Sequence, residues 1–253
     1  MSDAAAQVAG GSRWRGPLAQ LAGSLFFTGF FFLFTLAYAI PFVLLCLVLP
    51  FPRRFVLVRV YAASVLWVLK WSCGLDFRVE GAPLPPGCHV ALWKHSSTWE
   101  TIAMMVVFPR QVWVLKRELL WIPVVGAGVW QMHAIAIDRT AGQAAVSQII
   151  EQGKARLAEG DWVMVFPEGT RMAPGETRRY GVSGTLLASA AGALVVPVAH
   201  NAGRYWPRRG LVKKPGTVRV VIGAPVAPGG RDVRAVNEEI QRWIEATVRE
   251  LES

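Results

Sequence analysis

Hydrophobic residues are concentrated near the start of the chain. Residues 16–52 contain no Asp, Glu, Lys or Arg, and the centre of this segment, 25–49, is dominated by Phe, Leu, Val and Ala, with Pro41 inside it. A helix needs about 20 apolar residues to cross the hydrocarbon core of a bilayer. The segment is therefore long enough to form a membrane-embedded helix.

A second apolar stretch follows at 55–75, but it contains Arg59 and Lys70. Charges at these positions make a second complete crossing of the membrane costly. They suit an interfacial or bundle-packed helix whose basic side chains extend to the lipid headgroups. We therefore predict that residues 1–78 form an N-terminal hydrophobic two-helix membrane segment.

Basic residues flank the first apolar segment on both sides: Arg13, Arg15, Arg53, Arg54 and Arg59. Because positive charge disfavours translocation of a flank, we expect a hairpin or re-entrant pair with both ends on the cytoplasmic side. Two alternatives stay open: a single span with the N-terminus outside, and a signal peptide. Residues 37–39 read Ala-Tyr-Ala, which resembles a cleavage site. The apolar run continues to Pro50, however, so a cleaved chain would still begin with residues that need lipid.

A different pattern begins after the Pro/Gly-rich linker at 81–87, where short apolar runs alternate with helical periodicity. Predicted strands occupy 89–93, 112–115, 134–137, 162–166, 194–199 and 218–222. Predicted helices occupy 98–107, 142–157, 183–192 and 232–251, the last with a single apolar stripe. Several strands are continuously apolar, as expected for strands covered on both faces. This alternation predicts an α/β fold for residues 79–253, with a central, mostly parallel sheet flanked by helices.

Composition narrows the possible functions. Hydrophobic residues make up 53% of the 253 residues and charged residues 17%, against about 25% charged residues in a typical soluble domain. These values exclude an intrinsically disordered chain. The three cysteines are too few for a disulfide scaffold, and we expect them to be free thiols. The net charge of +10 predicts an anionic partner, which could be nucleic acid, an anionic lipid surface or a phosphorylated substrate.

The first cluster of candidate chemistry is Lys-His-Ser-Ser-Thr-Trp-Glu at 94–100, where a buried strand gives way to a helix. Sites in open α/β sheets usually lie at such a junction. His95 and Glu100 can meet if the histidine precedes the helix and the carboxylate lies in its first turn. A carboxylate bonded to one imidazole nitrogen makes the other nitrogen a better base. Alone, the cluster is equally typical of a Ser or Thr that caps a helix beside an incidental histidine.

The second cluster is Phe-Pro-Glu-Gly-Thr-Arg at 166–171, directly after the predicted strand 162–166. Gly169 permits a tight turn, and the planar fork of Arg171 suits bidentate bonding to a phosphate group. An anion site is therefore one interpretation. In isolation, the same residues also fit a strand followed by a turn with a surface ion pair.

Taken together, the two clusters resemble the phospholipid/glycerol acyltransferases of the bacterial lysophosphatidic acid acyltransferase type. His95 to Glu100 is similar to the H-x4-D box of that family, and 166–171 is identical to its F-P-E-G-T-R box. Two weaker blocks, 136–139 and 196–199, follow the order of the family's motifs. The resemblance extends over about residues 79–223. The chain differs from the family pattern at one position: the acid of the first box is Glu100 and not Asp.

The resemblance implies transfer of a fatty acyl chain from acyl-CoA or acyl carrier protein to the free hydroxyl of a lysophospholipid, most simply 1-acylglycerol-3-phosphate. His95 would be the base and Glu100 its orienting partner. The resemblance implies a substrate-binding role for six further residues: Lys116, Arg139, Glu168, Gly169, Thr170 and Arg171. No metal or bound cofactor is implied. The expected location is the cytoplasmic (inner) membrane, with the catalytic domain facing the cytoplasm.

Other classes fit the sequence less well. Residues 181–185 lack the last glycine of a G-x-S-x-G elbow, and 126–131 break a dinucleotide fingerprint. Three further histidines lack metal-ligand spacing and are interpreted as structural: His89, His133 and His200. The basic, aromatic segment 204–214 is compatible with nucleic acid, but beside a membrane segment it favours lipid headgroups. A different lysolipid acceptor, or a non-catalytic membrane protein that retains the fold, stays open.

Overall fold

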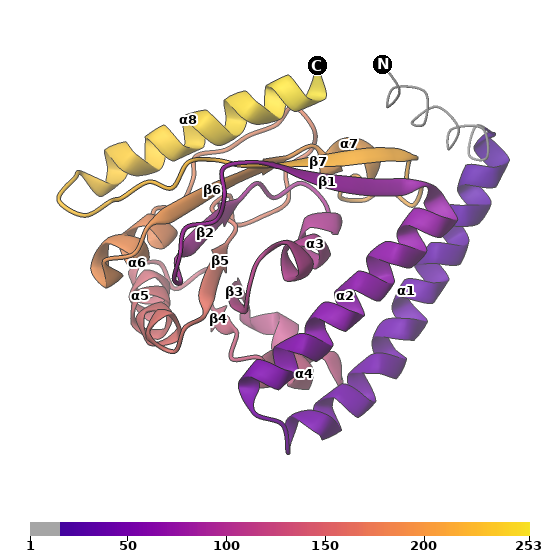
Figure 1. Cartoon of the computed structure of the whole chain (residues 1–253), viewed down its shortest axis with the longest axis horizontal. Coiled ribbons are helices and arrows are strands. Elements are labelled where there is room, and N and C mark those ends of the chain that lie inside the picture. Colours follow the sequence, from indigo (N-terminus) through magenta and orange to yellow (C-terminus); the bar gives the residue numbers. More distant parts are fainter. Residues whose placement is uncertain (1–15) are drawn as a thin grey trace.

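The computed structural model describes residues 16–253, so the predicted basic flank at Arg13 and Arg15 lies outside the described part of the chain. Two long helices, α1 (Pro17–Cys46) and α2 (Phe51–Cys73), form an antiparallel pair along one side of an α/β body (Figure 1). Both are long and apolar enough to cross a membrane, by length and composition alone. The two-helix segment predicted from the hydrophobic pattern is thus present.

The α/β body is built on a seven-stranded sheet with the strand order β1-β7-β6-β2-β5-β3-β4. Its strands are β1 (Leu75–Gly81), β2 (Val90–Trp93), β3 (Gln111–Lys116), β4 (Ile135–Ile137), β5 (Trp162–Val165), β6 (Val195–His200) and β7 (Gly216–Ile222). Every neighbouring pair is parallel except β6 and β7, which are antiparallel. The prediction of a mostly parallel central sheet is confirmed.

Helices connect the strands and cover both faces of the sheet. They are α3 (Trp99–Val107), the 3₁₀ helix η1 (Arg117–Trp121), α4 (Val125–Gln131), α5 (Gln143–Ala158), α6 (Ser183–Ala191), α7 (Ala202–Tyr205) and α8 (Val233–Glu252). The hairpin and α3 share one hydrophobic cluster with the sheet, whereas α5, α6 and α8 pack into another. The apolar stripe predicted for the last helix is buried on α8 at Val236, Ile240, Ile244, Val248 and Leu251.

Four elements were not predicted: β1, η1, α4 and α7. Strand β1 pairs with β7, with Leu75 opposite Gly216, and therefore crosses the boundary expected between residues 78 and 79. Beyond the buried Leu75 its residues are partly or fully exposed, because the strand lies at the edge of the sheet. The division of the chain into two domains stays a prediction.

Candidate active site

Both sequence motifs lie at the carboxyl ends of neighbouring parallel strands. His95 follows β2, and residues 166–171 follow β5. Leu92 is opposite Val165 in the parallel register of these strands. The two segments that follow therefore leave the sheet side by side, at the carboxyl ends of the strands. Ligands of open α/β sheets usually bind in a crevice at this edge.

The structure brings His95 and Glu100 together. Nδ1 of His95 lies 2.9 Å from Oε1 of Glu100. Because a carboxylate can only accept, Nδ1 carries the hydrogen and Nε2 carries the lone pair. The imidazole stacks on Phe166, with ring centroids 4.1 Å apart, and its side chain is 11% exposed. The ring is thus fixed in the orientation and tautomer that a base requires.

Glu100 is fully buried at the start of α3. Its Oε1 also accepts hydrogen bonds from the backbone N–H groups of Ser96 (2.9 Å) and Ser97 (2.8 Å). Burial raises the pKa of this carboxyl, but the hydrogen bond from His95 and the Ser97 amide, with the nearby His200, outweigh it. The net result is a pKa of Glu100 below its usual value. The carboxylate therefore stays ionised beside the imidazole.

His200, predicted to be structural, also lies in this cluster. Its Nε2 donates to the carbonyl of Lys94 at 2.8 Å and lies 4.0 Å from Oε2 of Glu100. Nδ1 accepts the N–H of Ala202 at 3.2 Å, and burial lowers the pKa of His200, so the ring is neutral. One sequence signal points to His200: it directly follows the block at 196–199. That block lies on β6, the strand beside β2.

Glu168 faces the interior behind His95. Its Oε1 accepts from Nζ of Lys94 at 2.7 Å, and its Oε2 accepts the backbone N–H of His95 at 2.6 Å. Glu168, Gly169 and Thr170 are not among the residues that line the cavity next to His95. Gly169 has a φ of +67°, which favours glycine, and makes the turn of this loop. The substrate-binding roles implied for these three residues stay predictions.

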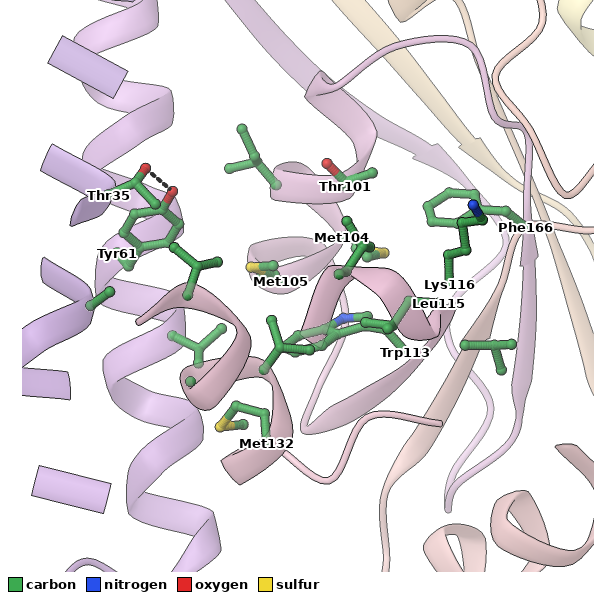
Figure 2. A pocket seen from close by; sticks show the side chains of 18 of the residues that line it. Thr35, Tyr61, Thr101, Met104, Met105, Trp113, Leu115, Lys116, Met132 and Phe166 are labelled. Atoms are coloured by element: carbon green, nitrogen blue, oxygen red, sulfur yellow. Dashed lines mark hydrogen bonds between the residues drawn. The ribbon is translucent and has the colours of Figure 1, made fainter. Parts of the chain in front are cut away.

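A cavity of about 470 Å³ lies between the hairpin helices and the sheet, and His95 lines it. On the hairpin side, Figure 2 shows Thr35 and Tyr61 joined by a 2.7 Å hydrogen bond. Met104 lies between the hairpin and the sheet, and Lys116 and Phe166 lie toward the sheet (Figure 2). Most of the lining is apolar, and the volume is typical of a small-molecule site.

Three of the six predicted substrate-binding residues line this cavity beside the imidazole, and all three are basic: Lys116, Arg139 and Arg171. Arg139 donates to the carbonyl of Gly169, and Lys116 forms an ion pair with Glu118 at 2.9 Å. Nε of Arg171 has no hydrogen-bond partner within residues 16–253. No Asp or Glu is among the described residues that line the cavity, so its polar part is suited to an anionic group.

The imidazole of His95, beside three cations and an apolar cavity, can therefore remove a proton from a substrate that carries an anionic group and an apolar chain. In the described part of the chain, no group of three or more His, Cys, Asp or Glu side chains is placed to hold a metal ion. The three cysteines are free thiols, as expected.

Comparison with known proteins agrees with this site. A sequence profile described as "Acyltransferase" matches residues 76–201, which include both motifs. The chain is 39% identical over 209 residues to the "1-acyl-sn-glycerol-3-phosphate acyltransferase" of Pseudomonas aeruginosa, covering 81% of each chain. It is 30% identical over 190 residues to the human "1-acyl-sn-glycerol-3-phosphate acyltransferase alpha", covering 72% of this chain and 67% of that one.

The fold is also known from a solved structure. The "1-acyl-sn-glycerophosphate (LPA) acyltransferase, PlsC" of Thermotoga maritima superposes with a TM-score of 0.74 over 91% of this chain and 96% of that chain, at 21% identity. The profile match and the relative from Pseudomonas aeruginosa make this chain an acyltransferase enzyme, and the superposition agrees with the fold. Within that class it belongs to the 1-acyl-sn-glycerol-3-phosphate acyltransferase family, as the two motifs predicted.

The lowered pKa of Glu100 predicts how the stability of the fold responds to acid. A carboxyl with a lower pKa in the folded chain stabilises the fold fully above the unfolded pKa, and this contribution is lost as the pH falls through the folded pKa. Between about pH 7 and about pH 3, the Tm of wild type in detergent should fall more steeply than that of Glu100→Gln. Thermal melts followed by circular dichroism measure both curves, and parallel curves would contradict the prediction.

Proposed function

We propose that the enzyme transfers a fatty acyl chain from an acyl thioester, acyl-CoA or acyl carrier protein, to the free hydroxyl of 1-acylglycerol-3-phosphate, which gives phosphatidic acid. One observation carries this proposal: an oriented His95 lines an apolar cavity together with three basic side chains. The names of the relatives from Pseudomonas aeruginosa and human support the same acceptor.

The proposed reaction needs no nucleophile from the protein. Nε2 of His95 takes the proton of the acceptor hydroxyl while the hydroxyl oxygen forms a bond to the thioester carbonyl carbon. The C–S bond then breaks, and the imidazolium returns the proton to the departing thiolate. Glu100 holds the ring and stabilises the imidazolium that forms in between. Base catalysis of this kind typically contributes about 10²–10⁴-fold.

Substrate binding is divided between the two parts of the cavity. Arg171, with Lys116 and Arg139, would hold the acceptor phosphate, because these cations line the cavity beside the base. Glu168 and Thr170 would contribute through the loop that carries Arg171. The apolar walls would take an acyl chain, whose burial contributes about 0.8 kcal/mol for each CH₂ group.

The α/β body is proposed to sit on the cytoplasmic face of the inner membrane. Helix α1 contacts this body at both of its ends: Gln20 Nε2 donates to the carbonyl of Lys213 at 3.2 Å, and Gln131 Nε2 donates to the carbonyl of Val43 at 3.3 Å. A helix held against the body near both of its ends supports a hairpin with both ends on one side. Exposed tryptophans on the hairpin and on the segment 117–131 suit the membrane interface: Trp67, Trp71, Trp121 and Trp130.

Replacing the proposed base tests the central claim. His95→Ala should lower the turnover number by at least about 10²-fold, because the imidazole acts in the transition state. Turnover is measured with purified protein, labelled acyl-CoA or acyl carrier protein, and a panel of lysolipids, with products identified by mass. His89→Ala is the matched control, since His89 lies at the opposite end of β2, where it bonds Pro86. More than about a tenth of wild-type turnover in His95→Ala would refute the base assignment.

The anion site gives a second prediction. Arg171→Lys keeps the charge but loses the planar fork, so it should raise KM for the acceptor more than KM for the donor. Steady-state kinetics with each substrate varied in turn measure the two constants. Arg179→Lys, on an exposed part of the same loop, should change neither. A larger rise in the donor KM would instead assign Arg171 to the phosphates of the donor.

The proposed topology is tested by labelling in intact cells. With the native thiols replaced by serine, cysteines introduced at Ser2 and at Ala82 should both resist an impermeant maleimide until the cells are lysed. The reason is that basic residues flank the first apolar segment on both sides. Labelling at position 2 in intact cells, with none at position 82, would replace the hairpin with a single span.

A further inference from the structure

The peptide unit that precedes His95 is held from two sides. Its N–H, which belongs to His95, donates to Oε2 of Glu168 at 2.6 Å. Its carbonyl, which belongs to Lys94, accepts from Nε2 of His200 at 2.8 Å. All of these groups are buried. Glu168 therefore fixes the backbone of His95, whereas Glu100 fixes its ring.

Glu168 is in turn held by a network that reaches the last helix of the chain. Nζ of Lys94 lies 2.7 Å from Oε1 of Glu168 and 2.9 Å from Oε1 of Glu245 on α8. The same ammonium donates to the carbonyl of Glu176 at 3.2 Å. Tyr180 donates its hydroxyl to Oε1 of Glu245 at 2.6 Å. The side chains of Lys94, Glu168 and Glu245 are 3%, 0% and 12% exposed.

The last helix, α8, lies apart from the cavity. It lies outside residues 76–201, which carry the family match, and contributes no side chain to the lining of the cavity. Figure 1 shows α8 on the side of the sheet opposite the hairpin. Glu245 nevertheless contacts Lys94, the residue directly before the base.

We propose that Lys94 is a positioning residue for His95 and that Glu245 anchors it from α8. Lys94 holds Glu168 in the orientation in which Oε2 accepts the His95 N–H, and Glu245 with Tyr180 holds the Lys94 ammonium. This inference rests on the proposed role of His95 as the base. It also assigns to Glu168 the role of holding the His95 backbone, which does not require Glu168 to line the cavity.

Charge balance explains why the ammonium matters. Two buried carboxylates share one cation, so removing the cation leaves two like charges facing each other in a poorly solvated place. Burial already raises the pKa of Glu168 to about 7, with Lys94 lowering it and Glu245 adding to the rise. Without Lys94, Glu168 would take up a proton and become a weaker acceptor for the His95 N–H. Neutralising Glu245 as well would remove only the smallest of these influences on the pKa of Glu168, so burial would keep Glu168 protonated.

The experiment compares Lys94→Met with the double variant Lys94→Met/Glu245→Gln. Lys94→Met should lower kcat at least about tenfold while KM for donor and acceptor changes less than about threefold, because neither substrate touches Lys94. Glu245→Gln alone should lower kcat at least about threefold, and the double variant should lose no more than Lys94→Met does, a coupling that independent sites would not show. Wild-type kcat in Lys94→Met overturns the inference. A further loss in the double variant, equal to that of Glu245→Gln alone, would show that Glu245 does not act through Lys94 and would remove it from the inference.

A matched control separates positioning from loss of stability. Arg110→Met removes the partner of the buried Asp161 at the amino end of the sheet, away from the cavity. It should lower Tm without lowering kcat, and an equal loss of kcat in Arg110→Met would overturn the positioning role. If Lys94→Met does not fold, Glu245→Ala replaces it, since this less buried change takes one acceptor from the ammonium and should lower kcat at least about threefold.

Failure of this inference can be told from failure of the proposed function. His95→Ala is assayed in the same series. Full turnover in His95→Ala overturns the base assignment, and the positioning role with it. Lost turnover in His95→Ala together with wild-type kcat in Lys94→Met overturns only the role of Lys94.

Discussion

The parallel pairing of β2 with β5 is the constraint on which the site depends. Residues 94–100 and 166–171 are far apart in the chain, and only a shared edge of the sheet brings them together. The same edge receives His200 from β6, the other neighbour of β2. Because these strands are buried on both faces, their side chains pack against the covering helices on either side, and this packing fixes the relative positions of the two loops.

At the start of α3, the buried carboxylate of Glu100 orients the imidazole of His95. A buried carboxylate is unfavourable unless it is paired and hydrogen-bonded. Glu100 meets this condition with two backbone amides at the start of the helix and the Nδ1–H of His95. The Nδ1–H bond that helps to stabilise the carboxylate therefore also orients the imidazole of the proposed base. The backbone amides in turn fix the carboxylate that holds this ring.

The sequence was most informative where the determining residues are close together or strongly apolar. His95 and Glu100 are within one turn of chain, and the buried strands are continuous apolar runs. Strand β1 was missed because most of its residues are partly or fully exposed at the sheet edge and it follows directly on an apolar helix. Helix α4 contains Gly126 and Gly128, poor helix formers, and is stabilised by tertiary contacts with α1 instead. The contact of Lys94 with Glu245 joins residues 151 positions apart, which no local pattern encodes.

The cavity has a wall that belongs to the hairpin. Side chains from both helices line it, among them Phe31 and Tyr38 of α1 and Val58 and Tyr61 of α2. Deleting the hairpin would therefore remove part of the cavity as well as the two candidate membrane spans. Trimming these residues would leave the cavity open on one side. The hairpin is both a candidate anchor and a wall of the cavity, so a substitution on its inner face changes the shape of the cavity too.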